Sequence, residues 1–482
     1  MLGLFGQNHP TKQWDRREFL RIGGLSAAGL SLPHLLSREA SATPSRPNNG
    51  RRRARSCVLF FLEGGPSHID LWDMKPNAPA EIRGQFSPIS TTVPGLQVSE
   101  LLPRVSQRMH RMTLVRSMTH RISDHNAGSY YAMTGRHPTN GSQLIIEDSA
   151  ENFPNYGSVL SFLRPSGQAL PDFVHVPEIM SNMGVDIAGQ KASFLGSAYE
   201  PFVAGDPSLP DYEIPGLNLS HISLDRFHQR EGLLQQLDGA ISQAGDNPQF
   251  QRMNGFYQRA LNLITSPEAR AAFDLSREPL SVRERYGTDP GSDRSIEARH
   301  FGGLPHLGQC LLLTRRLIEA GVRLVTCISG RRIDQAWDTH RDHHGLLRRS
   351  LTPAFDQAFS AFLDDMHIRG LLQETLIVVM GEFGRTPRLG QVVSGAGAEA
   401  DGRDHWPFCY SVLFAGAGIS EGRIHGASDS RGAYPSRDPV TPEDLTATIY
   451  DALGVPADTE IHDNLNRPHQ LVRGTSILEA IT

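Results

Sequence analysis

Six short apolar runs constrain the fold of this chain of 482 residues more than any other feature of its sequence. Such runs, ended by polar or Gly-rich loops, are typical of the buried strands of a parallel sheet. They lie at residues 57–62, 113–117, 173–176, 323–328, 375–380 and 410–415. Helical patterns at 304–320 and 353–369 precede the fourth and fifth runs, and Gly321 and Gly370 follow them as C-caps. This alternation predicts an α/β fold with a mostly parallel sheet.

The first 42 residues are typical of an export signal. Trp14-Asp15-Arg16-Arg17-Glu18-Phe19-Leu20-Arg21 fits a twin-arginine motif, an apolar stretch covers 22–36, and Ala40-Ser41-Ala42 suits cleavage. This stretch is too short to span a bilayer comfortably, and no later segment is long and apolar enough. We therefore expect a signal peptide at 1–42, the twin-arginine translocase as partner during export, and a periplasmic or otherwise extracytoplasmic protein without a membrane span. The alternative is a short basic N-terminal helix.

The rest of the chain is predicted to form one domain. Residues 43–55 are rich in Pro, Asn, Gly and Arg and are expected to form a flexible lead-in to a domain at 56–482. Within it, residues 178–300 are less regular, and we expect an insertion there with polar helices near 224–244 and 254–275. Thr441-Pro442-Glu443-Asp444 predicts the start of a capped C-terminal helix over 445–453.

Charge and cysteine content exclude two classes of protein. The net charge is −5, from 47 Lys+Arg and 52 Asp+Glu. A nucleic-acid-binding protein would need a basic face, so we expect no nucleic-acid partner. The four cysteines are far apart and form no C-x-x-C motif, which favours buried thiols over a disulfide framework or a zinc ribbon.

Carboxylates and imidazoles cluster next to the predicted strands. Because ligands bind beyond the carboxyl ends of parallel strands, we expect these side chains to meet at one edge of the sheet. Clustered carboxylates are unfavourable unless a cation neutralises them. The sequence therefore predicts a centre for one or two divalent metal ions, with Zn, Ca, Mn or Mg as candidates. The predicted metal ligands are Glu63, Asp338, His340, His343, Glu382 and His405.

Each of these residues also has a simpler interpretation. Glu63 stands before Gly64-Gly65 and could cap backbone amides. The segment 338–344 could be the solvated start of a helix. Glu382 could form an ion pair with Arg385 alone. The joint pattern favours the metal centre over any of these alternatives.

Several longer motifs identify the chain as a member of an exported bacterial family, domain-of-unknown-function family 1501. The motifs are Glu63-Gly64-Gly65-Pro66-Ser67-His68-Ile69-Asp70, His125-Asn126-Ala127-Gly128-Ser129-Tyr130, Trp337-Asp338-Thr339-His340, Gly381-Glu382-Phe383-Gly384-Arg385-Thr386-Pro387 and Gly402-Arg403-Asp404-His405-Trp406. The family in turn resembles the alkaline phosphatase and sulfatase superfamily. That resemblance implies a doubly wound α/β fold with a site for one or two metal ions.

The superfamily resemblance also implies roles for individual residues. Glu63 falls where the first metal carboxylate belongs, and Thr134-Gly135-Arg136 is similar to the T-G-R that ends the nucleophile helix of sulfatases. His125 then stands at the position of the sulfatase nucleophile, and Phe383 stands where a second ligand is usual. A formylglycine mechanism is therefore disfavoured.

The expected function is the hydrolysis of phosphate or sulfate esters by a metal-activated water or by His125. His125 and Arg385 are the predicted catalytic residues. Arg136, Arg403 and Asn126 are predicted to bind the substrate, a small anionic ester or a sulfated or phosphorylated glycan. Two alternatives stay open: a catalytically inactive metal-containing binding protein, and a structural protein whose polar cluster stabilises loops.

Overall fold

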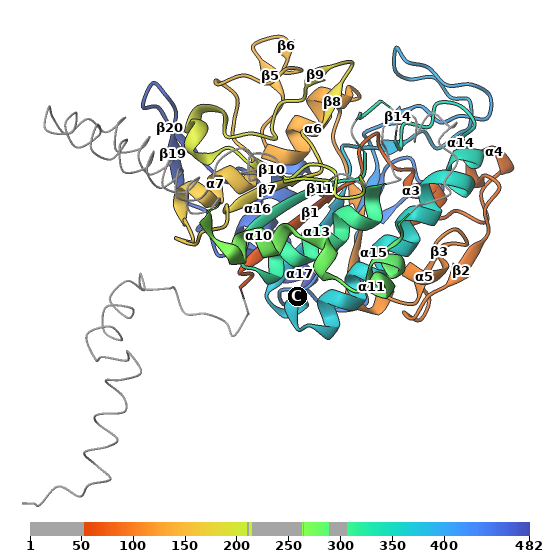
Figure 1. Cartoon of the computed structure of the whole chain (residues 1–482). Helices are drawn as coiled ribbons and strands as arrows, with labels where there is room; N and C mark the ends of the chain where they lie inside the picture. The colour runs from red at the N-terminus through yellow and green to blue at the C-terminus, as the bar shows by residue number, and fades with distance from the viewer. Residues whose placement is uncertain are drawn as a thin grey trace, which may run out of the picture. The chain divides into compact units, whose positions relative to one another are not determined.

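Six of the eight strands of the central sheet follow the apolar runs of the sequence. The computed structural model describes residues 53–209, 212–214, 263, 265–288, 306–330, 332–334 and 336–482. The sheet order is β10-β7-β11-β1-β12-β15-β4-β16 (Figure 1). The strands are β1 (Ser56–Phe61), β4 (Met112–Met118), β7 (Phe173–Val176), β10 (Phe202–Val203), β11 (Leu324–Ile328), β12 (Thr375–Met380), β15 (Tyr410–Ala415) and β16 (Arg423–His425).

Only one strand runs against the others. β15 pairs antiparallel with both β12 and β4, while every other pair in the sheet is parallel. The predicted mostly parallel α/β fold is therefore confirmed. The two edge strands, β10 and β16, were not predicted, because two or three residues are too few to show a strand pattern.

Both faces of the sheet are buried. In β1, Val58 and Phe60 join one hydrophobic core, while Cys57, Leu59 and Phe61 join a second core. This alternation follows from the period of two residues in a strand. A sheet with helices on both faces accounts for strand sequences that are apolar throughout.

Helices from different parts of the chain cover the two faces. The first core includes residues of α13 (Leu307–Glu319) and α15 (Thr352–Ile368). The second includes residues of α6 (His125–Thr134), α7 (Tyr156–Leu163) and α16 (Pro442–Ala452). The predicted capped C-terminal helix is α16, where Thr441 and Asp444 form a capping box.

Part of the predicted organisation lies outside the described residues: the signal peptide at 1–42, most of the lead-in at 43–55 and the helix at 224–244. Of the helix predicted at 254–275, the structure shows α10 (Pro267–Phe273), which begins anew after the N-cap Ser266. Proline fits the first turn of a helix and disrupts its interior, so the boundary falls at Pro267. In the described part of the chain, no helix combines the length and apolarity needed to cross a membrane. The four cysteines there are buried and free.

Candidate metal centre

The loops that leave β1, β4, β11 and β12 share one edge of the sheet with the loop that enters β15. β15 is antiparallel, so its start lies beside the ends of its neighbours. Asp338 and His340 follow β11, and His125 begins α6 after β4. His405 lies in β14 (His405–Trp406), which precedes β15 and pairs with β13 (Gly384–Arg385).

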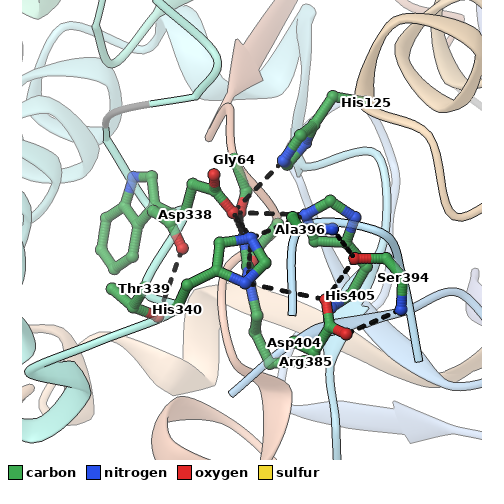
Figure 2. A network of polar contacts seen from close by, with 12 residues as sticks. Gly64, His125, Asp338, Thr339, His340, Arg385, Ser394, Ala396, Asp404 and His405 are labelled. Atoms are coloured by element: carbon green, nitrogen blue, oxygen red, sulfur yellow. Dashed lines mark hydrogen bonds and ion pairs between the residues drawn. The ribbon is translucent and has the colours of Figure 1, made fainter. Parts of the chain in front are cut away.

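Asp338 is the focus of this cluster. Its Oδ1 lies 3.2 Å from His125 Nε2, 2.8 Å from His340 Nε2 and 3.4 Å from His405 Nε2. Figure 2 shows these side chains turned toward one carboxylate. The four potential ligand atoms lie within 4.8 Å of one another. We call His125, Asp338, His340 and His405 the metal centre.

Hydrogen bonds from the Nδ1 atoms, which point away from Asp338, fix the orientation of the His340 and His405 rings. His405 Nδ1 donates to Ser123 O at 2.6 Å, and His340 Nδ1 donates to Gly397 O. A carbonyl only accepts, so each Nδ1 carries a proton and each Nε2 faces the centre. Metal-bound histidines are held in the same way, with the far nitrogen donating to an oxygen.

The inner nitrogens of His340 and His405 face one another across the centre. His340 Nε2 and His405 Nε2 are 3.0 Å apart, and both face Asp338. Burial, together with the charges of His125 and Arg385, lowers the pKa of His405 to about 4, so its Nε2 is unprotonated at neutral pH. A proton satisfies two of these atoms at a time, whereas a divalent cation satisfies all four. The donor set, three imidazoles and one carboxylate, fits Zn and related metals.

His125 differs from the other two histidines because carboxylates hold both of its nitrogens. Nδ1 lies 2.6 Å from Glu382 Oε1, and Nε2 faces Asp338. Burial opposes its charge, but the two carboxylates raise the pKa of His125 to about 9. In the absence of metal the ring is therefore an imidazolium at neutral pH, which can neither accept a proton nor act as a nucleophile.

Arg385 lies at the centre and is completely buried. It donates to Asp338 and Gly64 O, to Gly65 O at 2.9 Å and to Arg403 O at 3.1 Å. Although burial opposes it, the charges of Arg385 and His125 hold the pKa of Asp338 well below its usual range. The predicted alternative, an ion pair between Glu382 and Arg385, is not formed, since Arg385 pairs with Asp338 instead.

Glu63 and Glu382 flank the centre and have no solvent exposure. Ser329 donates to Glu63 Oε2 through its backbone N at 3.0 Å and its Oγ at 2.8 Å, so Glu63 does cap one amide. Glu382 Oε1 accepts from Gly64 N at 2.9 Å. Glu63 Oε1 and Glu382 Oε2 have no hydrogen-bond partner in the described part of the chain. Burial, with the nearby charge of Glu382, raises the pKa of Glu63 to about 8.

These two raised pKa values predict that the metal-free protein loses stability as the pH rises. Between pH 6.5 and about 8, folded Glu63 and His125 retain protons that the unfolded chain has lost. The unfolded state then binds fewer protons, so each group favours unfolding by about tenfold per pH unit. We expect the urea midpoint, measured with a chelator present, to fall across this range. The fall should be smaller in Glu63→Gln; an equal fall in both proteins would contradict the pKa of Glu63.

A second cluster holds His343 apart from the metal centre. Asp70 Oδ2 accepts from Ser67 Oγ at 2.6 Å and lies 2.9 Å from His343 Nε2 and 2.8 Å from Arg403 Nε. His344 Nε2 is 3.8 Å from Asp70 Oδ1. Although burial opposes it, the charge of Arg403 lowers the pKa of Asp70 far below normal. Asp70 forms a buried ion pair with Arg403, and this cluster offers one carboxylate and two imidazoles, one potential ligand fewer than the metal centre.

Arg403 ties this cluster to the loops of the metal centre. Its guanidinium donates to Thr386 O at 2.9 Å and Ile82 O at 2.8 Å, and also to Pro387 O. His343 Nδ1 contacts Thr339 Oγ1 at 2.7 Å, next to Asp338. Asp70, His343 and Arg403, which we call the Asp70 network, therefore hold the loops at 338–344 and 384–387 together. A helix, α14 (His343–Leu346), does start in this segment after the exposed Asp342, but His343 and His344 themselves are buried.

The structure thus brings together most, but not all, of the predicted site residues. Arg136 lies beyond the C-terminal end of α6, roughly 15 Å along the helix from His125, stacked over Phe153 at 3.9 Å. Asn126 binds Ile146 O and Asn182, and Arg403 binds Asp70, so the predicted substrate-binding groups are engaged with protein atoms. Asp70 was not among the predicted ligands or catalytic groups, although its motif, Ser67-His68-Ile69-Asp70, follows a strand.

Comparison with known proteins gives a family and several distant structures. The family described as "Protein of unknown function (DUF1501)" matches residues 54–482. Among curated proteins, no sequence matches the chain.

Three solved structures share low identity with the chain. They are the lipoteichoic acid synthase LtaP from Listeria monocytogenes (11% identity, 91% of this chain and 80% of that chain covered, TM-score 0.37), the PsFucS1 sulfatase from Pseudoalteromonas sp. (10%, 84% and 68%, 0.36) and a protein in the alkaline phosphatase superfamily from Vibrio parahaemolyticus (11%, 87% and 73%, 0.38). Likenesses this distant leave the activity to be argued from the side chains of this chain.

Proposed function

The chain belongs to the DUF1501 family of proteins of unknown function, and from the geometry of its metal centre we propose that it is an exported, metal-dependent hydrolase of phosphate or sulfate esters. The observation that carries the proposal is the convergence of three imidazole Nε2 atoms on Asp338 Oδ1. The twin-arginine motif at Arg16-Arg17 supports export with the metal already bound.

His125, Asp338, His340 and His405 would hold the metal. When bound, a divalent metal of this kind polarises an ester oxygen and lowers the pKa of water toward ~7. Ser123 and Gly397 fix the orientation of two imidazoles through their carbonyls. Glu382 accepts the Nδ1 proton of His125 and so aims Nε2 into the centre.

The predicted catalytic roles change in this proposal. His125 is assigned as a ligand, because its Nε2 faces Asp338 Oδ1 together with the Nε2 atoms of His340 and His405. Arg385 neutralises Asp338 and holds Gly64 and Gly65, and thereby fixes the loop after β1. Phe383 packs against His125 and His405, with ring centroids 4.9 Å and 4.7 Å away, and excludes water from that side.

One observation favours the alternative, a metal-containing binding protein without turnover. The guanidinium groups of Arg385 and Arg403 are committed to Asp338, Asp70 and backbone carbonyls. An ester hydrolase usually keeps a cationic group free to hold the anion. If the bound metal itself holds the anion, this difference disappears, so measurement of turnover separates the two functions.

The test begins with elemental analysis of the mature protein purified from its extracytoplasmic fraction. We expect a stoichiometric divalent metal in the wild type and in His110→Ala, a half-buried histidine bonded to Thr92, and a large loss in His340→Ala. The metal-loaded protein is then assayed on aryl phosphates, phosphodiesters and sulfate esters. Turnover that follows metal content supports the hydrolase. A loaded protein inert on the whole panel supports the binding protein, and a protein without metal contradicts both.

A further inference from the structure

Exposed apolar side chains gather on three loops beside the metal centre. Thirteen large apolar side chains are exposed in the described part of the chain, and six of them lie on three loops. The first loop is the hairpin β5–β6 (Thr139–Asn140, Gln143–Leu144) with its continuation to residue 146. The second is the hairpin β8–β9 (Ser181–Asn182, Val185–Asp186), and the third is the loop 389–401. Single exposed apolar residues are ordinary, whereas a gathering marks a binding surface. We call these residues the apolar rim: Leu144, Ile146, Met183, Val185, Val392 and Val393.

Each of the three loops forms a hydrogen bond either with a residue of the metal centre or with a residue that adjoins one in the sequence. Asn126, next to His125, donates to Ile146 O at 2.8 Å and accepts from Asn182 Nδ2 at 2.7 Å. Figure 1 shows the two hairpins gathered over α6. In the third loop, Gly397 O accepts from His340, and Val393 N donates to Asp404, next to His405, at 2.6 Å. The apolar rim therefore borders the metal centre.

Met183 lies at a turn position whose backbone conformation does not favour methionine. It occupies the first tip position of the hairpin β8–β9 with φ 49°, and Gly184 follows with φ 86°. A two-residue turn with positive φ at both positions favours Asn-Gly, and a bulky residue there is strained. Met183 is nevertheless 84% exposed, so its side chain gains no packing within the described chain. A residue that breaks a local rule without a structural gain indicates a function.

The chemistry of the three loops selects the kind of ligand. Residues 139–148, 181–186 and 389–401 contain no aromatic residue on which a sugar ring could stack. Their charged residues are all acidic: Glu147, Asp148, Asp186, Glu399 and Asp401. Lys191 pairs with Asp148 at 3.1 Å and with Asp186 at 2.7 Å, so the negative charge that is left is that of Glu147, Glu399 and Asp401. Acidic loops repel polyanions such as sulfated glycans and anionic membrane surfaces. An uncharged aliphatic chain is the group that suits the rim.

We propose that the substrate is an amphiphilic monoester whose alkyl chain lies on the apolar rim while its phosphate or sulfate group lies at the metal centre. This proposal rests on the proposed hydrolase function and names its substrate class. Water attacks phosphorus or sulfur, the bond from that atom to the alkyl oxygen breaks, and the alcohol leaves with a proton taken from the water. The alcohol is the part of the ester that must lie outside the polar centre, where the rim is.

The experiment measures the binding of alkylphosphonates of increasing chain length to the metal-loaded protein, by calorimetry below the micelle concentration. Phosphonates are not hydrolysed, so binding is read independently of turnover. We expect affinity to rise by up to roughly fourfold per methylene in the wild type, since each buried methylene contributes about 0.8 kcal/mol. In Met183→Asn/Val185→Thr the rise should flatten, while methylphosphonate binds equally well. Asn suits the positive φ of Met183, so the hairpin should be at least as stable as before.

The matched control is Ile368→Asn, which removes an apolar side chain of similar exposure, 74%, at the end of α15. It should bind like the wild type. A wild-type affinity independent of chain length overturns the proposal, as does an unchanged rise in the rim variant. Sedimentation of the wild type, but not of the rim variant, with phosphatidylcholine vesicles overturns it in favour of a membrane surface. If binding follows the prediction but no ester is hydrolysed, the hydrolase function fails and the alkyl site stands.

Discussion

Replacing Asp338 by Asn is expected to lower the affinity for the bound metal at least about 100-fold. Asp338 Oδ1 is the one carboxylate oxygen that faces all three imidazoles of the metal centre, and no other acidic group of the described chain takes that place. Changes to groups that only support metal ligands already weaken binding about 10–100-fold, so loss of a charged ligand should have a larger effect. Competition with a chromogenic chelator measures the affinity.

The control for this variant is Asp364→Asn. Asp364, like Asp338, is paired with arginine, here with Arg108 at 2.6 Å and Arg111 at 2.7 Å, but it lies outside the centre. Its metal affinity should equal that of the wild type. Stoichiometric, tight metal in Asp338→Asn would show that the convergence of imidazoles on this carboxylate is not a metal site. Circular dichroism of both variants ensures that folded proteins are compared.

The second large effect is expected from Asp70→Asn. The substitution leaves Arg403 buried and charged without its carboxylate, and breaking such a pair costs about 3–5 kcal/mol of the free energy of unfolding. The Asp70 network also holds the loops of the metal centre, so metal affinity should fall about 10–100-fold. Urea unfolding of the metal-free protein and chelator competition measure the two effects.

The control Asp356→Asn separates the effect on the free energy of unfolding from the effect on metal affinity. Asp356 is another buried carboxylate, and it accepts from the backbone N atoms of Arg104 and Val105 at the start of α5 (Pro103–Ser106). Its loss should cost about 1–3 kcal/mol and leave metal affinity unchanged. If the wild type binds two metal ions and Asp70→Asn binds one without losing stability, then Asp70, His343 and His344 form a second metal site and the Asp70 network is not structural.

The sequence predicted the fold and the general position of the centre for a simple reason. Glu63, Asp338 and Glu382 all lie shortly after apolar runs, and strand ends of a parallel sheet must share an edge. His405 lies at the same edge although it precedes a strand, because β15, the strand that follows it, is antiparallel to its neighbours. The family was predicted from local motifs around these residues, and the match over 54–482 confirms it.

Other features depend on long-range packing that a single sequence does not reveal. Arg385 lies at the centre, whereas His343, predicted as a metal ligand, belongs to the Asp70 network; their partners, Asp338 and Asp70, depend on which way each side chain turns. Asp70 and Arg403 are separated by 333 positions. Arg136 was predicted to bind the substrate because its motif is similar to one of sulfatases. It lies beyond the far end of α6 from His125, so the two residues are not close together. The hairpins that form most of the rim are too short to show a strand pattern.

The position of β1 in the sheet has a consequence for synthesis of the protein. Its neighbours in the sheet are β11 and β12. Cys57 can therefore pair only after Leu324 has been synthesised, and Ser56 only after Thr375. At about 5–20 residues per second, the ribosome needs on the order of tens of seconds to supply them. During that time β1, which is apolar from Cys57 to Phe61, has both edges unpaired and is prone to aggregation. Chains that terminate before residue 375 would therefore be expected to aggregate, and metal uptake can only follow release of the nearly finished polypeptide.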